Sequence, residues 1–537
     1  PPPPAPPRAS AQPQSLDQVV VTASRMRVAE MAAAPAPAMY AAPMIAADAM
    51  ASQPANTERY PERDHTRSHR ARDHPVSTFS IDVDTGSYSN VRRMLRQGVR
   101  PPADAVRAEE FINYFSYGHP APTDLKTPFR ATTELAPAPW NPQRQLLMIG
   151  IKGYDVDKSE LPPANLVFLI DTSGSMFSPD KLPLLKQSFA ELTQQLRPQD
   201  RVSIVVYAGS AGLVLPPTSG ERKDEILAAL EQLQAGGSTN GGDGIRLAYA
   251  TARQAYVKGG VNRVILATDG DFNVGTVDGG SLETMVADQR SHGIALTTLG
   301  FGQGNYNDAL AGRLADAGDG NHAYIDTLQE ARKVLVEEMS STLLTIAQDV
   351  KIQIEFNPAQ VAEYRLIGYE NRMLAREDFA NDKVDAGDIG AGHEVTALYE
   401  ITLAGSGAER LPALRYGEGK PAAVTRTDNE LAHLRLRYKR PGDASSQLIE
   451  TPILRSALKA QPSDTMRFAA SVAAYADALR GGKHLEQWSW QSIADNARVT
   501  AGADRWKLRA EFVELVDAAR GLVEGTPDDQ VQVSVAR

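Results

Sequence analysis

The chain contains no cysteine among its 537 residues. Disulfide bonds, thiolate metal sites and cysteine nucleophiles are therefore excluded. The chain also lacks any uninterrupted apolar run of about 18 residues, the length that a membrane-spanning helix requires. An excess of basic residues is absent too, because the formal net charge is −10. This charge argues against a general nucleic-acid-binding protein, which would carry a basic surface.

The composition is that of a folded protein with more than one core. Hydrophobic residues make up 42% of the chain and charged residues 23%, and the length predicts two to four domains. The first residues are PPPP and no methionine precedes them, so we expect a trimmed or processed start, with any signal peptide or lipid-bearing residue outside this sequence. Membrane association is then expected only through such a lipid anchor.

Residues 1–75 are rich in proline, alanine, serine and arginine, and they show no sustained periodicity. This composition predicts a disordered tether. Near its end lie three histidines, His65, His69 and His74, within an arginine-rich stretch. They could bind a metal ion, but a solvated linker is the favoured interpretation.

Strand-like and helix-like segments alternate over residues 164–346. LVFLI, RVSIVVYAG, RVILATDG and IALTTLGFG are strand-like, and amphipathic segments such as KLPLLKQSFAELTQQL and GIRLAYATARQAY lie between them. The alternation predicts an α/β domain of Rossmann-like type, with a doubly wound, mostly parallel sheet that helices cover on both faces. Ligands bind such sheets at the carboxyl ends of the strands.

Changes of period divide the rest of the chain. We expect an N-terminal extension of helices and strands over residues 76–163, packed on a β-rich, sandwich-like domain over residues 347–445. A helical C-terminal region is expected over residues 446–525, followed by a flexible tail over residues 526–537.

Polar side chains follow the strand LVFLI directly, at Asp171, Ser173 and Ser175. One interpretation is a helix N-cap, since Asp and Ser cap helices well. An aspartic protease is rejected, because the DTGS at residues 84–87 would need a second such loop facing it, within an all-β fold. A dehalogenase-type phosphatase is rejected as well, because Gly86 stands where that motif has threonine or valine.

The third interpretation is a metal site, because Mg²⁺ prefers oxygen ligands. Thr239 lies in the glycine-rich AGGSTNGGDG before a helix-like segment, and Asp269 lies in ILATDGDFN at the end of a strand. These two loops and the loop of Asp171 each follow a strand of the predicted sheet or precede one of its helices. Their side-chain oxygens can therefore converge. The neighbouring Asn240, Asp243 and Asp271 are interpreted as turn and cap residues.

The order D-x-S-x-S, then Thr, then Asp resembles the metal-ion-dependent adhesion site of von Willebrand factor type A (VWA) domains. The resemblance implies that Ser173, Ser175 and Thr239 contact a divalent cation directly, with Asp171 and Asp269 often acting through water. The cation would be Mg²⁺, or else Mn²⁺ or Ca²⁺. The sixth position would be left for an Asp or Glu carboxylate of an unknown protein partner.

The flanking segments carry a second resemblance. STFSIDVDTGSYSNVRRMLRQG and PPADAVRAEEFINYF look like the N-terminal extension of the YfbK-like envelope proteins of bacteria. The chain from about residue 350 resembles the C-terminal domain of unknown function in that family, and the whole match covers roughly residues 77–525. Family members commonly look like lipoproteins, which implies lipid anchorage in the cell envelope.

One segment of the tether, SLDQVVVTASR at residues 15–25, contains the β-prone run Val19–Val21. Such a run could add a strand to the sheet edge of a partner. The segment is similar to the one that leads into the plug of TonB-dependent outer-membrane receptors, which implies a TonB-like partner and the periplasm of a Gram-negative cell. A chance apolar patch is the alternative.

Three functions remain open. The leading hypothesis is a non-enzymatic binding module whose cation bridges to a partner carboxylate. A metal-dependent hydrolase is the least favoured, although a bound cation can activate water. It lacks a recognisable general base, because His292 and His322 are expected in connecting loops with no motif around them. The third is a structural scaffold of the envelope that does not use its metal site.

Overall fold

The computed structural model describes residues 67–81, 84–123, 126–270, 279–303, 308–338, 343–412, 429–486, 488–504 and 506–524. The Val19–Val21 segment, His65 and Asp271 lie outside these ranges. Among the helices within them, none combines the length and the apolar character needed to cross a membrane.

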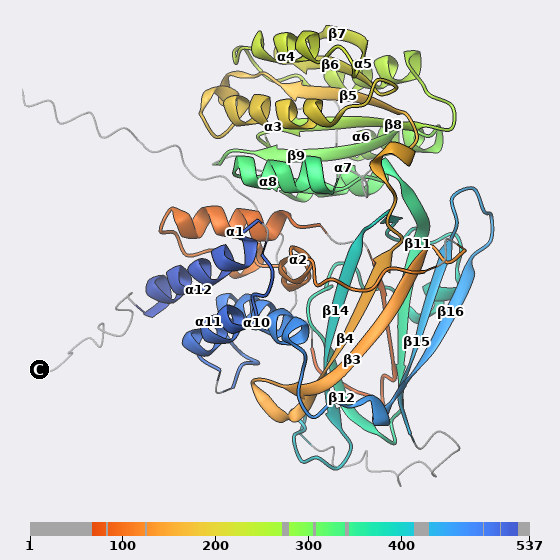
Figure 1. Ribbon diagram of the computed structural model, residues 1–537, viewed down its shortest axis with the longest axis vertical. Coiled ribbons are helices and arrows are strands. Elements are labelled where there is room, and N and C mark those ends of the chain that lie inside the picture. Colours follow the sequence, from red (N-terminus) through yellow and green to blue (C-terminus); the bar gives the residue numbers. More distant parts are fainter. Residues whose placement is uncertain are drawn as a thin grey trace, which may run out of the picture. The chain divides into compact units, whose positions relative to one another are not determined.

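The α/β domain is built on a six-stranded sheet with the strand order β10-β9-β8-β5-β6-β7 (Figure 1). The strands are β5 (Ala164–Asp171), β6 (Arg201–Tyr207), β7 (Ala211–Ser219), β8 (Val261–Thr268), β9 (Ala295–Phe301) and β10 (His322–Ile325). All neighbouring strands are parallel except β6 and β7, which pair antiparallel. The doubly wound, mostly parallel sheet is therefore confirmed.

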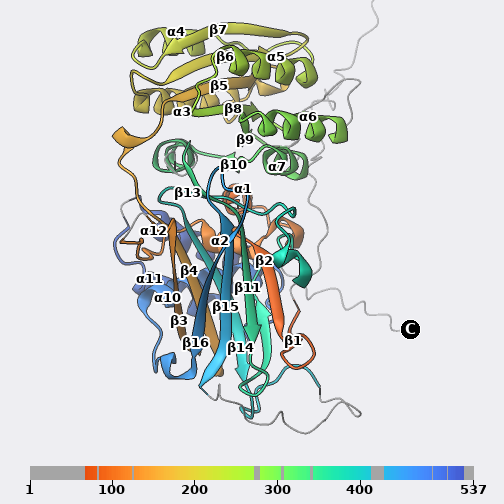
Figure 2. The same cartoon turned by 90° about the vertical axis from the view of Figure 1, so that its right-hand side faces the viewer.

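Helices cover both faces of this sheet. They are α3 (Leu182–Gln195), α4 (Lys223–Glu231), α5 (Gly241–Gln254), α6 (Gly279–Ser291), α7 (Asp308–Ala317) and α8 (Leu328–Arg332), which continues as a π-helical turn (Lys333–Glu337). Figure 2 shows α3 and α4 on one side of the strands and α5, α6 and α7 on the other. The side chains of β5 alternate accordingly: Phe168 and Ile170 pack in the cluster with α3, and Val167 and Leu169 in the cluster with α5.

A β-sandwich is assembled from strands on both sides of the α/β domain in the sequence. One sheet has the order β1-β12-β14-β4-β3 and the other β13-β11-β15-β16, with β2 also paired to β11. The strands are β1 (His69–Arg70), β2 (Val76–Ser80), β3 (Phe129–Ala138), β4 (Asn141–Gly153), β11 (Thr345–Phe356), β12 (Val361–Leu366), β13 (Ile389–Gly390), β14 (Glu394–Leu403), β15 (Glu430–Lys439) and β16 (Gln447–Leu454). Because β4 pairs with β14 and β2 with β11, the α/β domain is an insertion in this sandwich.

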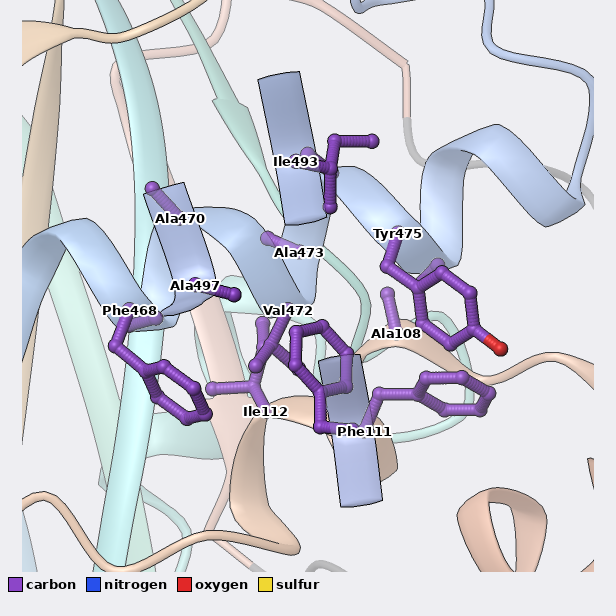
Figure 3. Close-up of a cluster of buried hydrophobic side chains, with 14 of the residues drawn as sticks. Ala108, Phe111, Ile112, Phe468, Ala470, Val472, Ala473, Tyr475, Ile493 and Ala497 are labelled. Carbon is purple, nitrogen blue, oxygen red and sulfur yellow. The ribbon is translucent and has the colours of Figure 1, made fainter. Parts of the chain in front are cut away.

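A layer of helices covers the outer face of the sheet that contains β4. The helices are α1 (Gly86–Arg96), α2 (Ala108–Asn113), α10 (Asp464–Leu479), α11 (Trp490–Val499) and α12 (Leu508–Glu524). On β4, Leu147 and Ile149 belong to the apolar cluster between the two sheets, whereas Leu146 and Met148 belong to the cluster under the helices. Figure 3 shows part of the latter cluster, in which the ring of Phe111 from α2 lies 5.9 Å from that of Tyr475 on α10.

Two boundaries expected from composition are wrong. The tether is expected to run to residue 75, but His69–Arg70 forms β1 on β12, and the His69 ring stacks on Tyr364 at 5.6 Å. The helical region is expected to begin at residue 446, but Gln447–Leu454 forms β16 on β15. Both segments are edge strands, ordered by backbone bonds to one neighbour, so their side chains carry little apolar alternation.

Candidate metal centre

The sheet brings two aspartates to its carboxyl edge. Asp171 is the last residue of β5, and Asp269 directly follows β8, the parallel neighbour of β5. Both residues are fully buried. Thr239 lies two residues before α5, whose N-cap is Asn240. The strand ends and the helix start thus lie where the fold class predicts a ligand site.

The loop after β5 presents its two serine hydroxyls together. The Ser173 amide donates to Asp171 Oδ1 at 2.8 Å, and the hydroxyl oxygens of Ser173 and Ser175 are 3.0 Å apart. The buried Met176 anchors the 3₁₀ turn Gly174–Phe177 beneath them. Ser173 is buried and Ser175 is exposed, so the pair reaches from the protein interior to solvent.

The loop that carries Thr239 is tied to the loop after β5 by backbone hydrogen bonds. The Gly174 amide donates to the Gly237 carbonyl at 3.0 Å, and the Gly236 amide donates to the Thr172 carbonyl at 2.8 Å. Gly237 has φ +85°, a conformation that favours glycine. These bonds fix the half-buried Thr239 in a loop that is held against the serines.

Three further side chains, which the sequence did not single out, contact the aspartates. The Tyr207 hydroxyl and the Thr268 hydroxyl donate to Asp171 Oδ2 at 3.2 and 3.3 Å. Lys181 Nζ donates to Asp269 Oδ2 at 2.9 Å. Tyr207 and Thr268 are the last residues of β6 and β8, and polar residues at the carboxyl ends of these strands could have been predicted to lie at the site. Lys181 precedes a helix, where a lysine is ordinarily a solvated residue.

The buried carboxyls concentrate negative charge. Burial raises the pKa of Asp171 to about 6, and the nearby Asp269 carboxylate contributes to the increase. The hydrogen bonds from Ser173 and Tyr207 act in the opposite direction and lower this pKa. A raised pKa means that the charged form of Asp171 is poorly compensated by the protein alone. A cation at this edge of the sheet would stabilise it.

The donor set fits a hard divalent cation. It offers hydroxyl oxygens from Ser173, Ser175 and Thr239 and carboxylates from Asp171 and Asp269, with no nitrogen or sulfur donor. Oxygen ligands of this kind suit Mg²⁺, Mn²⁺ and Ca²⁺. In the described part of the chain, no three or more His, Asp or Glu side chains are grouped to hold a metal. A cation here would therefore depend on the hydroxyl oxygens.

Other polar residues near the site have local partners. Asn240 Nδ2 donates to Asp243 Oδ2 at 2.9 Å, and Arg246 pairs with Asp243 at 3.1 Å, as expected for side chains around a helix start. His322 is not in a connecting loop as expected. It begins β10, is buried and lies 2.9 Å from the Thr298 hydroxyl. Because it begins a strand that runs in the same direction as β5 and β8, it lies at the amino ends of the strands, away from the aspartates at the carboxyl ends.

Family models match three parts of the chain. The model of the von Willebrand factor type A domain matches residues 165–338, and a model described as von Willebrand factor matches residues 54–148. The model described as the C-terminal part of the uncharacterized protein YfbK matches residues 341–522. The first match contains every residue of the candidate metal centre.

Individual proteins are similar over different lengths. The Escherichia coli (strain K12) protein named uncharacterized protein YfbK is 50% identical over 491 residues, which cover 89% of this chain and 84% of that protein. Human inter-alpha-trypsin inhibitor heavy chain H4 is 31% identical over 148 residues, or 26% of this chain and 16% of that protein. A solved von Willebrand factor type A structure from Catenulispora acidiphila is 16% identical, covers 74% of this chain and 91% of that chain, and gives a TM-score of 0.39.

Proposed function

Because the chain belongs to the YfbK family of VWA-domain proteins, we propose that it is a non-enzymatic binding module. In this proposal a divalent cation, held by the loops of Asp171, Thr239 and Asp269, bridges to an Asp or Glu carboxylate of a protein partner. VWA domains often mediate metal-dependent interactions between proteins, so the proposal assigns to this chain the use that its domain commonly has.

The observation that carries the proposal is the gradient of exposure across the site. Asp171, Asp269 and Ser173 are buried, while Ser175 is exposed. A cation held at this place would have protein ligands on its inner side and solvent on its outer side. Only two of its protein donors carry charge, so the cation would keep positive charge for an outside anion, such as a carboxylate.

An exposed aromatic ring on the rim supports a protein as the partner. Phe177, two residues after Ser175, is 81% exposed. A large exposed apolar side chain gains free energy when a partner covers it, and aromatic residues are frequent among the few that dominate protein interfaces. Phe177 would pack beside the carboxylate that the partner offers to the cation.

The roles of the chain's own residues follow from their contacts. A bound cation supplies an electrophilic coordination position. Asp171 fixes the serine loop by accepting from the Ser173 amide. A hydrolase would also need a general base, and the two histidines considered for it are unsuited: His322 lies at the opposite sheet edge, and His292 contacts the Asp288 carbonyl at 2.7 Å on the surface.

The proposal includes the cell envelope of a Gram-negative bacterium as the location, with a lipid anchor and a TonB-like partner for Val19–Val21. Its support is the sequence resemblance alone. Fractionation of cells that produce the full-length protein tests the location: recovery with the envelope supports it, and recovery in the cytoplasm would refute it.

Calorimetric titration of Mn²⁺ and Mg²⁺ into the metal-stripped protein tests the site. Wild type should bind one ion, and the double variant Asp171→Ala, Ser173→Ala should not. Asp243→Ala is the matched control, because Asp243 lies near Thr239 but its side chain is 58% exposed and pairs with Arg246; it should bind like wild type. Acetate should then perturb the electron paramagnetic resonance of bound Mn²⁺. Failure of wild type to bind even in the presence of acetate would overturn the bridging mechanism and favour the scaffold.

A further inference from the structure

A lysine is built into the candidate metal centre. Lys181 immediately precedes α3, and its side chain is only 9% exposed. Its ammonium group lies 2.9 Å from Asp269 Oδ2, and the Asp269 side chain is fully buried. A buried ion pair of this kind is not a surface contact that forms by chance, because both charges have given up their water.

The fold holds the lysine in this place. Gly302, which follows β9, has φ +72°, and a Cβ atom there would overlap the Lys181 side chain. The Gly302 carbonyl in turn accepts a hydrogen bond from the Tyr324 hydroxyl of β10. Glycine is thus required at position 302 both by the backbone conformation and by the lysine stem. The end of β9 forms a slot that directs the ammonium group to Asp269.

The charge of the lysine bears directly on a cation at the same carboxylates. Asp171 and Asp269 together supply two negative charges, and the Lys181 ammonium group offsets one of them. A divalent cation that shares Asp269 with the ammonium group meets like-charge repulsion at short range, where the surroundings screen charge poorly. A carboxylate from outside would restore the missing negative charge.

We propose that Lys181 is a resident counter-ion that competes with the divalent cation for Asp269 and so makes cation binding depend on the partner's carboxylate. Lys181 is therefore a positioning residue for the bridging function proposed above, and the inference rests on that function. Since linkage between two ligands is reciprocal, the partner also binds more tightly when the cation is present. The divalent cation and the protein partner would therefore bind together and dissociate together.

The test compares Mn²⁺ affinity, measured by calorimetry and electron paramagnetic resonance, in wild type and Lys181→Met. Methionine keeps an unbranched stem in the Gly302 slot and removes the charge. Without carboxylate in the buffer, Lys181→Met should bind Mn²⁺ at least about 10-fold more tightly, because it removes a like-charge repulsion that acts over a few ångströms. Lys186→Met is the matched control, since Lys186 lies on α3 itself and pairs with the exposed Glu231; it should bind Mn²⁺ like wild type.

A second readout separates competition from a merely structural role. Saturating acetate, corrected for its own binding of Mn²⁺, should raise the Mn²⁺ affinity of wild type more than that of Lys181→Met. If Lys181→Met does not fold, Lys181→Gln replaces it, because the neutral amide also removes the positive charge.

The outcomes distinguish this inference from the function on which it rests. If wild type binds Mn²⁺ and the folded neutral variant binds it equally or more weakly, the counter-ion inference is wrong and the bridging function stands. An equal effect of acetate on both proteins also overturns the inference. If neither protein binds Mn²⁺, both the function and the inference fail.

Discussion

Two buried cations of this molecule are held in contrasting ways. Arg92 of α1 is 1% exposed, and all five N–H donors of its guanidinium group are used in hydrogen bonds. We call this group the Arg92 cluster; its acceptors are Asp326, Glu330, Glu511 and Tyr114. Lys181, at the candidate metal centre, instead places a compact ammonium group on a flexible stem against Asp269.

In the proposed mechanism the two charges have different roles: Arg92 stabilises the fold, and Lys181 gives up its place to a divalent cation. The Arg92 cluster joins α1 to the residues after β10 and to α12. A planar guanidinium group whose donors all form hydrogen bonds is held firmly in one position. The ammonium group of Lys181 is a point charge, and a divalent cation can take over its electrostatic role. Four measurements sharpen or break this comparison, taken here from the largest expected effect to the smallest.

Removal of the charge at Arg92 should cause the largest loss. Arg92→Met removes the main cationic partner of the buried carboxylates of Asp326 and Glu330, and breaking such a buried pair costs about 3–5 kcal/mol. The free energy of unfolding from urea titration measures the change. Arg96→Met is the control, because Arg96 pairs with Glu511 but is 46% exposed, so its change should stay below about 1 kcal/mol. Equal losses in the two variants would contradict a special role for Arg92.

Replacement of Asp171 should change binding more than stability. Asp171→Asn keeps the size of the side chain and removes its charge, so Mn²⁺ affinity should fall by about 10- to 100-fold. The free energy of unfolding of the metal-free protein should change by less than about 1 kcal/mol, since the carboxylate charge is poorly compensated there. Calorimetry and urea titration measure the two quantities. A large loss of stability with unchanged affinity would assign Asp171 the same role as the Arg92 cluster.

A buried carboxyl among other carboxyls extends the comparison to pH. Glu109 of α2 is buried, and one of its oxygens has no hydrogen-bond partner. Burial, followed by the charges of Glu370 and Glu110, raises the pKa of Glu109 to about 7. A raised carboxyl pKa stabilises the fold fully below the unfolded-state pKa near 4.5, and this stabilisation is lost as pH rises through 7. Between pH 5 and pH 8, the titration of Glu109 should therefore lower the free energy of unfolding by about 2–3 kcal/mol.

Glu109→Gln checks this dependence, because glutamine mimics the protonated side chain at every pH. Urea titrations at pH 5 and pH 8 should show a smaller loss of stability in the variant than in wild type. A pH dependence identical to that of wild type would exclude Glu109 as its source.

The smallest effect is expected at the rim of the metal centre. Hexanoate should bind the Mn²⁺-loaded protein more tightly than acetate, because its alkyl chain covers part of Phe177. Phe177→Ala should remove this preference, a change of about 1 kcal/mol, and leave Mn²⁺ affinity itself unchanged. Val499→Ala is the control, since Val499 is 72% exposed on α11. A preference for hexanoate that survives in Phe177→Ala would exclude the ring as a docking element.

Much of the α/β domain could be predicted from the sequence because its signals are local. A buried strand can be recognised in the sequence as an apolar run. The rule that ligands bind at the carboxyl ends of parallel strands requires only the order of the strands and helices. The sheet does bring Asp171 and Asp269 to one edge, and it ties the loop of Thr239 to the serines. The backbone hydrogen bond between Gly174 and Gly237 had no sequence signal of its own.

The remaining features depend on contacts that no local pattern records. Arg92 meets Asp326 across 234 positions of the chain, and an arginine within a helix ordinarily reads as a solvated residue. Lys181 was overlooked for the same reason. The edge strands β7 and β16 were missed because each pairs with one neighbour and alternates poorly, β7 with two prolines in AGLVLPPTS. Tertiary pairing, not intrinsic preference, orders these segments.

The insertion of the α/β domain into the sandwich has a mechanical consequence. The chain enters the domain from β4 and leaves it into β11, and each of these strands is paired on both sides: β4 with β3 and β14, and β11 with β15 and with β2 and β13. Antiparallel hydrogen bonds run perpendicular to the strands, so tension along β4 or β11 shears many bonds at once instead of peeling them singly. If a partner binds at the candidate metal centre as proposed, a pull on that partner would be shared by two interior strands.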